Sequence, residues 1–185
     1  FVLRDIPLHL VTFEKEQLMK QALCEAPEEG LLLEFGVYQG SSIKLIANNR
    51  QTQMVYGFDS FQGIPEPFHS NSTGTFSVTD LPQVPNNVQL IKGWFDDTLP
   101  DFARKHDANC AFLHIDCDLY SSTAKIFEVF GSRIVPGTVL LFDEFFNYPG
   151  WREGEYKAFR EFCESRNVCF EYLGTTFRSI SFTKS

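Results

Sequence analysis

AFLHIDCD, residues 111–118, is a short apolar run that ends in two carboxylates. TVLLFDE, residues 138–144, repeats this arrangement further along the chain. Short apolar runs between turn signals are typical of buried strands in a parallel sheet, and ligands of open α/β sheets bind beyond the carboxyl ends of such strands. Two neighbouring strands that end in acids therefore direct several negative charges toward one crevice. Because unpaired like charges are costly at short range, we expect a hard cation, a cationic ligand or a proton-transfer role there.

Strand-like and helix-like runs alternate on both sides of these two stretches. The apolar runs predict strands at 31–35, 54–58, 88–92, 110–115 and 138–142, and helical spacing predicts helices at 41–49, 123–130 and 154–166. Two last strands, at 170–173 and 177–182, are joined by a connection too short for a parallel crossover, so they should be antiparallel. The pattern predicts the α/β class, with a doubly wound sheet, one reversed strand and helices on both faces.

The length of 185 residues predicts a single domain over residues 1–185. Residues 1–25 contain loosely helical apolar spacing and are expected to form an N-terminal helical cover over the sheet edge; the spacing is carried by Leu10, Phe13, Gln17, Leu18 and Leu23. Residues 60–87 are rich in Pro, Ser, Thr, Asn and Gly and show no period. Loops of this length are usually functional or disordered, and this one leaves the carboxyl end of the second strand. We therefore expect a lid or substrate loop over 60–87.

Composition narrows the class of protein. The chain is 43% hydrophobic and carries a net charge of −8, which disfavours nucleic acid as a partner because such binding depends on basic side chains. Its apolar runs are much shorter than the roughly 20 residues that a bilayer span needs, so no membrane association is expected. Five cysteines without CxxC spacing favour a reducing, cytoplasmic location and argue against structural zinc. No signal peptide is expected.

A glycine turn follows the first strand in the segment EFGVYQG, residues 34–40. A dinucleotide-binding turn would carry glycine where Glu34 stands, so an acid followed by Gly36 and Gly40 better suits a ligand with an ammonium group and no pyrophosphate. Asp59 ends the second strand, where a carboxylate can accept ribose hydroxyls. The structural alternatives are that the glycines only form a turn and that Asp59 caps a helix or lies in a solvated loop.

Five linked motifs carry a family resemblance. They are EFGVYQGSS (34–42), GFDSFQGIP (57–65), GWFDDTLP (93–100), HIDCDLYSST (114–123), and the Pro136-Gly137 pair that leads to Asp143 and Glu144. Over roughly residues 30–165 the chain resembles class I S-adenosylmethionine (SAM) methyltransferases of the macrocin O-methyltransferase-like family. Well-known members of that family methylate sugar hydroxyls of antibiotics in a metal-dependent way. The resemblance implies a Rossmann-like seven-stranded sheet with the last strand antiparallel, and SAM as cofactor.

Candidate site residues follow from the resemblance and from the glycine turn described above. The candidate cofactor-binding residues are Glu34, Gly36, Tyr38, Gly40, Ser41, Asp59, Ser60, Gly93, Trp94, Phe95 and Asp116. Asp116, Asp143 and Glu144 match the metal ligands, and an all-carboxylate set favours Mg²⁺. Asp116 and Asp118 are the candidate catalytic residues, although Asp118 is also placed to be a turn or N-cap residue. The third ligand position commonly carries Asp rather than Glu144, and the chain is shorter than typical antibiotic-tailoring members.

These observations predict an enzyme that transfers a methyl group from SAM to a hydroxyl of a small molecule, such as a sugar or another diol, with assistance from Mg²⁺. Two alternatives remain open at this point. One is a SAM-fold binding protein without methyl transfer, and the other is a nicotinamide-dependent oxidoreductase on a similar sheet, against which Glu34 argues. The sequence does not determine the oligomeric state, and a homo-oligomer is one of the open alternatives.

Overall fold

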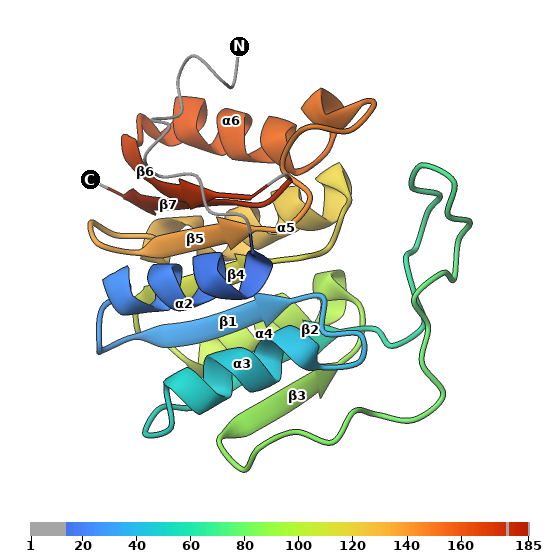
Figure 1. Cartoon of the computed structure of the whole chain (residues 1–185), viewed down its shortest axis with the longest axis horizontal. Helices are drawn as coiled ribbons and strands as arrows, with labels where there is room; N and C mark the ends of the chain where they lie inside the picture. Colours follow the sequence, from blue (N-terminus) through green and yellow to red (C-terminus); the bar gives the residue numbers. More distant parts are fainter. Residues whose placement is uncertain (1–13, 177, 185) are drawn as a thin grey trace.

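The central sheet is seen in a computed structural model that describes residues 14–176 and 178–184. Within these residues seven strands form one sheet in the order β3-β2-β1-β4-β5-β7-β6 (Figure 1). The strands are β1 (Leu31–Phe35), β2 (Val55–Asp59), β3 (Val88–Lys92), β4 (Cys110–Ile115), β5 (Val139–Phe142), β6 (Phe170–Thr175) and β7 (Ile180–Lys184). Strands β1 to β5 pair in parallel, and β7 is antiparallel to both β5 and β6. The predicted sheet with one reversed last strand is confirmed.

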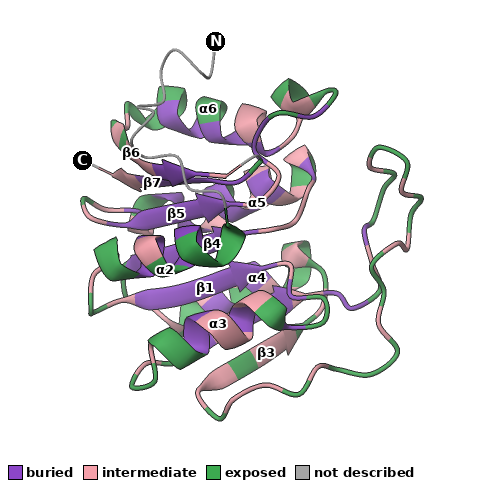
Figure 2. Cartoon of the chain, viewed as in Figure 1, coloured by how far each residue is buried: buried purple, intermediate pink, exposed green. Residues whose placement is uncertain are grey.

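Helices cover both faces of this sheet. They are α2 (Lys15–Glu25), α3 (Ser41–Asn49), α4 (Phe95–Lys105), α5 (Tyr120–Phe130) and α6 (Glu155–Arg166), with short 3₁₀ turns η2 (Gly131–Arg133) and η3 (Trp151–Glu153). The apolar side chains of α2 and α3 share one buried cluster, and those of α4, α5 and α6 share another. Figure 2 shows the central strands buried between these two layers. The predicted doubly wound arrangement follows from burying both faces of the strands.

The helix boundaries differ from the predictions in places. The predicted helix at 41–49 is α3, whereas α5 begins at Tyr120, three residues before the predicted start at Thr123. Helix α4 was not predicted, because Pro100 lies inside it and proline normally disrupts a helix interior. Its buried Leu99 and Phe102 anchor it against the sheet. Acidic residues in its first turn and basic residues in its last turn interact favourably with the helix dipole and stabilise the helix. Tertiary packing therefore outweighs the local cost of the proline.

The predicted N-terminal cover is described only from residue 14 onward. Leu18 and Leu23 are buried on α2, and Gln17 is exposed on the same helix. Leu10 and Phe13 lie outside the described residues. None of the described helices is long and apolar enough to cross a membrane.

The segment from 60 to 87 contains no helix or multi-residue strand, only the isolated bridges Gln62–Ser77 and Phe68–Asn71. It leaves β2 at the carboxyl edge of the sheet and extends away from the body of the protein (Figure 1). Its rings contact the segment after β5, since the centroids of Phe68 and His69 lie 5.9 Å and 4.8 Å from that of Tyr148. The strand order reverses between β1 and β4, so the loops at this edge diverge and leave room for a ligand.

Candidate active site

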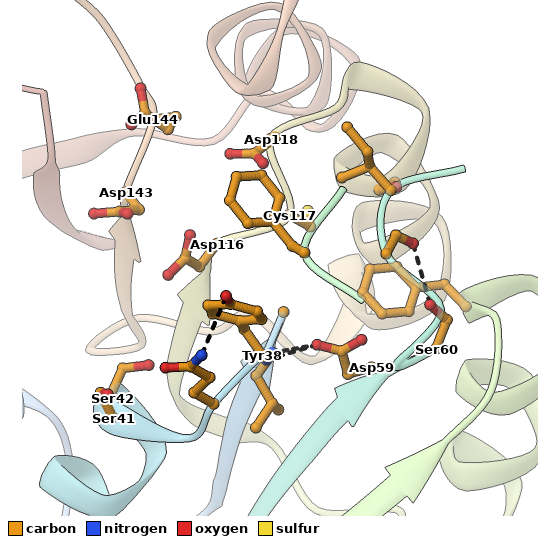
Figure 3. A pocket seen from close by; sticks show the side chains of 18 of the residues that line it. Tyr38, Ser41, Ser42, Asp59, Ser60, Asp116, Cys117, Asp118, Asp143 and Glu144 are labelled. Carbon is orange, nitrogen blue, oxygen red and sulfur yellow. Dashed lines mark hydrogen bonds between the residues drawn. The ribbon is translucent and has the colours of Figure 1, made fainter. Parts of the chain in front are cut away.

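A cavity of about 960 Å³ opens at the carboxyl edge of the sheet. Most of the predicted site residues line it: Gly36, Tyr38, Ser41, Asp59, Ser60, Gly93, Trp94, Phe95, Asp116, Asp118, Asp143 and Glu144. Two predicted residues do not. Glu34 is fully buried beneath the turn, and Gly40 precedes α3, with a left-handed backbone at φ +78°. Figure 3 shows Asp116, Asp118 and Asp143 around one end of the cavity and Asp59 and Ser60 around the other.

Asp59 braces the turn that follows β1. Its Oδ2 accepts hydrogen bonds from the backbone N–H groups of Val37 and Tyr38, both at 2.8 Å, and its Oδ1 accepts one from Phe61 at 2.7 Å. Tyr38 has a φ of +49°, an unfavourable conformation for a bulky residue that these bonds help to hold. A carboxylate has about four acceptor sites, and these three bonds fill both sites of Oδ2 and one of Oδ1, so Asp59 retains one acceptor site, on Oδ1. One carboxylate therefore orders the two turns that form this end of the cavity.

Gly36 brings the turn after β1 against the acidic segment after β4. Its φ is +94°, and a Cβ built at this position would lie 1.8 Å from the carbonyl oxygen of Asp116. The two segments are joined by a hydrogen bond from the N–H of Asp116 to the carbonyl of Phe35, at 2.9 Å. This close approach requires glycine, so Gly36 positions the acidic end of the cavity as well as the turn.

Tyr38, Trp94 and Phe95 supply aromatic walls. The Tyr38 ring is 41% exposed and meets Phe76 of the long loop edge to face, with centroids 5.7 Å apart. Trp94 is 37% exposed and directly precedes α4. The N–H of the neighbouring Gly93 donates a hydrogen bond to the carbonyl of Asp59, at 3.0 Å. Partly exposed rings beside a cavity provide flat apolar surfaces on which a planar ring can stack.

Glu34 forms a buried pair with His114 instead of facing the cavity. Its Oε1 lies 2.9 Å from Nδ1 of His114, and both side chains are 0% exposed. Burial alone would lower the pKa of His114, but the hydrogen bond and charge of Glu34, with Asp116 and Asp143 nearby, raise it above its usual value. The Oε2 of Glu34 and the Nε2 of His114 have no hydrogen-bond partner among the described residues. Glu34 therefore ties β1 to β4 beneath the site, and His114 is a buried core residue that pairs with it.

Replacing Glu34 by Gln should lower the free energy of unfolding by about 1.5–3 kcal/mol, the range for a hydrogen bond that involves a charged group. The amide keeps the shape of the side chain but removes the charge that faces His114. Urea unfolding followed by circular dichroism measures the change. Glu171→Gln, at an exposed position of β6, is the matched control and should change stability by less than about 0.5 kcal/mol. Equal effects of the two substitutions would contradict this assignment.

The acidic end of the cavity is built by the segments after β4 and β5. Burial, followed by repulsion from Asp143, raises the pKa of Asp116, whereas Lys15 lowers the pKa of Asp143 against the effect of its own burial. The Lys15 ammonium lies 2.7 Å from Oδ2 of Asp143 and 3.6 Å from Oδ2 of Asp116. Ser179 donates a hydrogen bond to the other oxygen of Asp143, at 2.9 Å. The sequence indicated the two acids but not Lys15, which precedes both by more than a hundred positions in the chain and meets them only in the folded protein.

Asp118 has a backbone conformation that another acid holds in place. Its φ is +63°, and its N–H and that of Cys117 both donate to Oε1 of the buried Glu155, at 3.2 and 3.3 Å. Burial, followed by the charges of Glu144 and Asp143, raises the pKa of Asp118 to about 6. The sequence did not indicate a role for Glu155 at the site. Its position as an acid in the first turn of α6 is common in helices and does not point to this contact. Asp118 thus lines the cavity with a carboxylate that no described residue engages in an ion pair or hydrogen bond.

The three predicted metal ligands do not converge on one point. Glu144 is turned to Arg178, with its oxygens 3.1 and 3.3 Å from the guanidinium, while Asp116 and Asp143 face Lys15. In the part of the chain that the structure describes, no group of three or more His, Cys, Asp or Glu side chains is gathered to hold a metal ion. Carboxylates suit Mg²⁺ in chemistry, but this ion needs near-octahedral oxygen ligands at about 2.0–2.1 Å. The arrangement therefore does not fit the predicted site.

Comparison with protein families and curated proteins gives a consistent result. A family model described as a methyltransferase domain matches residues 33–145. The 8-demethyl-8-(2,3-dimethoxy-alpha-L-rhamnosyl)-tetracenomycin-C 4'-O-methyltransferase of Streptomyces olivaceus is 30% identical over 143 residues, which are 63% of this chain and 53% of that protein. The demethyldecarbamoylnovobiocin O-methyltransferase of Streptomyces niveus is 27% identical over 158 residues, 70% of this chain and 58% of that protein. The chain thus spans little more than half the length of these curated relatives.

Solved structures share the fold. The calicheamicin methyltransferase CalS11 superposes with a TM-score of 0.73 at 22% identity, covering 91% of this chain and 76% of that chain. The O-methyltransferase NovP superposes with a TM-score of 0.71 at 19% identity, covering 92% and 79%. At these identities the likeness establishes the fold of the sheet and its helices.

Proposed function

Because this chain belongs to the class I methyltransferase domain family, we propose that it transfers a methyl group from SAM to a hydroxyl of a small molecule. The observation that carries the proposal is the cavity itself, in which a turn braced by Asp59 faces an acidic end across the point where the strand order reverses. The family match removes the support for a nicotinamide-dependent oxidoreductase.

The glycine turn and the aromatic walls suit the cofactor. In the proposed complex the methionine part lies along Gly36, Tyr38 and Ser41, and one ribose hydroxyl donates to the remaining acceptor site of Asp59. Trp94 stacks beside the adenine, with Ser60 and Gly93 at its border. Gly40 does not contact the cofactor in this proposal; its left-handed backbone lets the turn lead into α3. Glu34 stabilises the sheet beneath the site by pairing with His114 across β1 and β4. When bound, SAM supplies an electrophilic methyl group on a sulfonium centre.

The acidic end of the cavity suits the acceptor. We assign proton acceptance to Asp118, because its carboxylate is not engaged by a described residue and its pKa of about 6 leaves it ionised at neutral pH. The acceptor hydroxyl would give its proton to this carboxylate as its oxygen forms the bond to the methyl carbon and the bond from that carbon to sulfur breaks, with S-adenosylhomocysteine as the leaving group. Asp116 lies next to it and orients the acceptor. Holding the two reactants in line supplies much of the rate enhancement in reactions of this kind, up to about 7–11 kcal/mol.

The acceptor class follows from the relatives and the long loop. One curated relative is named as a 4'-O-methyltransferase of a rhamnosyl-tetracenomycin, so we propose a sugar or another diol as acceptor. Residues 60–87 are proposed to close over it as a lid, since Glu66 already accepts a hydrogen bond from Ser121 of α5, at 3.0 Å. The Mg²⁺ predicted from the motifs has no three-carboxylate site among the described residues, so no step above is routed through it.

Calorimetric titration with S-adenosylhomocysteine tests the proposal. Saturable binding by the folded wild-type protein is expected, and Asp59→Asn should weaken it by on the order of 10- to 100-fold, because one or two charge-assisted hydrogen bonds of the turn are lost. Asp80→Asn, an exposed acid in the 60–87 loop that follows β2 and outside the cavity lining, is the matched control and should bind as the wild type does. A folded protein that does not bind S-adenosylhomocysteine would contradict the proposed function.

A further inference from the structure

The ammonium group of Lys15 lies between Asp116 and Asp143 at the acidic end of the cavity. Lys15 Nζ is 2.7 Å from Oδ2 of Asp143 and 3.6 Å from Oδ2 of Asp116. The Asp116 and Asp143 side chains are only 25% and 17% exposed, so their attraction to the ammonium is screened less than at an open surface. The ammonium therefore takes the position that a cation bridging the two carboxylates would take.

The start of α2 is fixed in a way that keeps Lys15 there. Leu18, Met19, Ala22 and Leu23 are buried on the sheet side of this helix. The helix packs against β5, β6 and β7, and the 2.7 Å contact between Lys15 and Asp143 places its first residue at the carboxyl end of β5. Because the helix is anchored by this burial, only the Lys15 side chain has to be ordered to form the contact. The lysine is thus part of the packed structure of the site.

The third acid is held elsewhere by its own partners. Arg178 binds both oxygens of Glu144, and the hydroxyl of Tyr148 donates to the Glu144 carbonyl at 2.9 Å. In Figure 3 the Glu144 carboxylate points away from Asp116 and Asp143. A divalent ion ligated by all three acids would require both the Arg178 pair to break and the Lys15 ammonium to leave.

We propose that Lys15 is the built-in cation of the Asp116–Asp143 pair and that the acceptor oxygen binds beside it without a divalent metal ion. An ammonium has three N–H donors, and the two carboxylates engage at most two of them, so one is left to donate to the acceptor oxygen as negative charge develops on it. This role for the acceptor rests on the proposed function, whereas the exclusion of the metal ion from the acid pair does not.

Titration of Mg²⁺ alone, by calorimetry, tests the exclusion. The wild type should show no saturable site at millimolar Mg²⁺. Lys15→Met keeps the length of the side chain and removes the charge, and it should gain a Mg²⁺ site at least about tenfold tighter than any wild-type binding, because the carboxylates lose their counter-charge. Lys20→Met is the matched control, since Lys20 lies on the same helix and pairs only with Glu16 among the described acids. This control should behave as the wild type does.

Two results would overturn the inference: a wild-type Mg²⁺ site that Asp116→Asn abolishes, or a folded Lys15→Met protein that gains no Mg²⁺ binding. If Lys15→Met does not fold, Lys15→Arg and Lys15→Gln replace it, with metal exclusion expected in the first and metal binding in the second. The S-adenosylhomocysteine titration is read separately. Its failure would contradict the methyltransferase proposal, while the metal titrations would still decide whether Lys15 excludes the ion.

Discussion

Gly36→Ala should destabilise the protein by about 3–5 kcal/mol, the sum of a strained positive φ and an overpacked contact. The added Cβ would lie 1.8 Å from the carbonyl oxygen of Asp116 and 2.7 Å from its carbonyl carbon. Both are backbone atoms at the end of a central strand, so a side-chain rotation cannot relieve the clash. Relief requires β1 and β4 to separate at the point where the turn after β1 meets the acidic segment after β4.

The matched control for this change is Gly150→Ala. Gly150 also has a positive φ, +82°, but a Cβ there would meet nothing within 4 Å. We expect a loss of only about 1–2 kcal/mol, from backbone strain alone. Urea denaturation of both variants measures the difference. S-adenosylhomocysteine binding should also be lost in Gly36→Ala and kept in Gly150→Ala; equal stabilities would show that the close approach at Gly36 relaxes at little cost.

Asp118→Asn should lower the rate of methyl transfer by about 10²–10⁴-fold, the usual contribution of a positioned general base. Asparagine is nearly the same size, tolerates the left-handed backbone at φ +63°, and keeps the N–H that donates to Glu155. The segment should therefore keep its shape while losing the group that accepts the proton. Affinity for S-adenosylhomocysteine should stay within about twofold of the wild type, since a change limited to the chemical step leaves ground-state binding unchanged.

The rate is measured as S-adenosylhomocysteine release with the diol acceptor that a screen identifies. Asp96→Asn is the control, because Asp96 is another carboxylate of the cavity lining but has a side chain 84% exposed and a Lys125 partner at 3.6 Å. This control should turn over at close to the wild-type rate. Should Asp118→Asn remain fully active while Asp116→Asn is inactive, proton acceptance would belong to Asp116.

The strands could be predicted because they are buried on both faces. In β1, β4 and β5 every residue is buried, and such strands read as continuous apolar runs. Helix α4 could not be predicted in the same way, since Pro100 argues against it and only the packing of Leu99 and Phe102 explains it. The resemblance to class I methyltransferases is confirmed by the family match, and the acids placed at the strand ends do line the cavity.

The partners of those acids could not be predicted. Lys15, Glu155 and Arg178 meet the acidic segments only through tertiary packing, and no local spacing relates them to Asp116 or Glu144. Glu34 is a case in which the sequence suggested a ligand contact that the fold does not make. A carboxylate beside a glycine turn suggests ligand contact, yet its strand position directs it into the core, where it pairs with His114. The sequence indicates which groups are charged, and the fold decides which charge each one meets.

The segment that matches the methyltransferase domain family ends at residue 145 and begins at residue 33. Lys15, Glu155, Arg178 and Ser179, which set the charge and shape of the acidic end, all lie on the flanks of that segment. The acids of this end, Asp116, Asp118, Asp143 and Glu144, lie within the matched segment, whereas the side chains that pair with them lie outside it. Chimeras that exchange only the flanks between two members of the family offer a route to altered acceptor chemistry on an unchanged core.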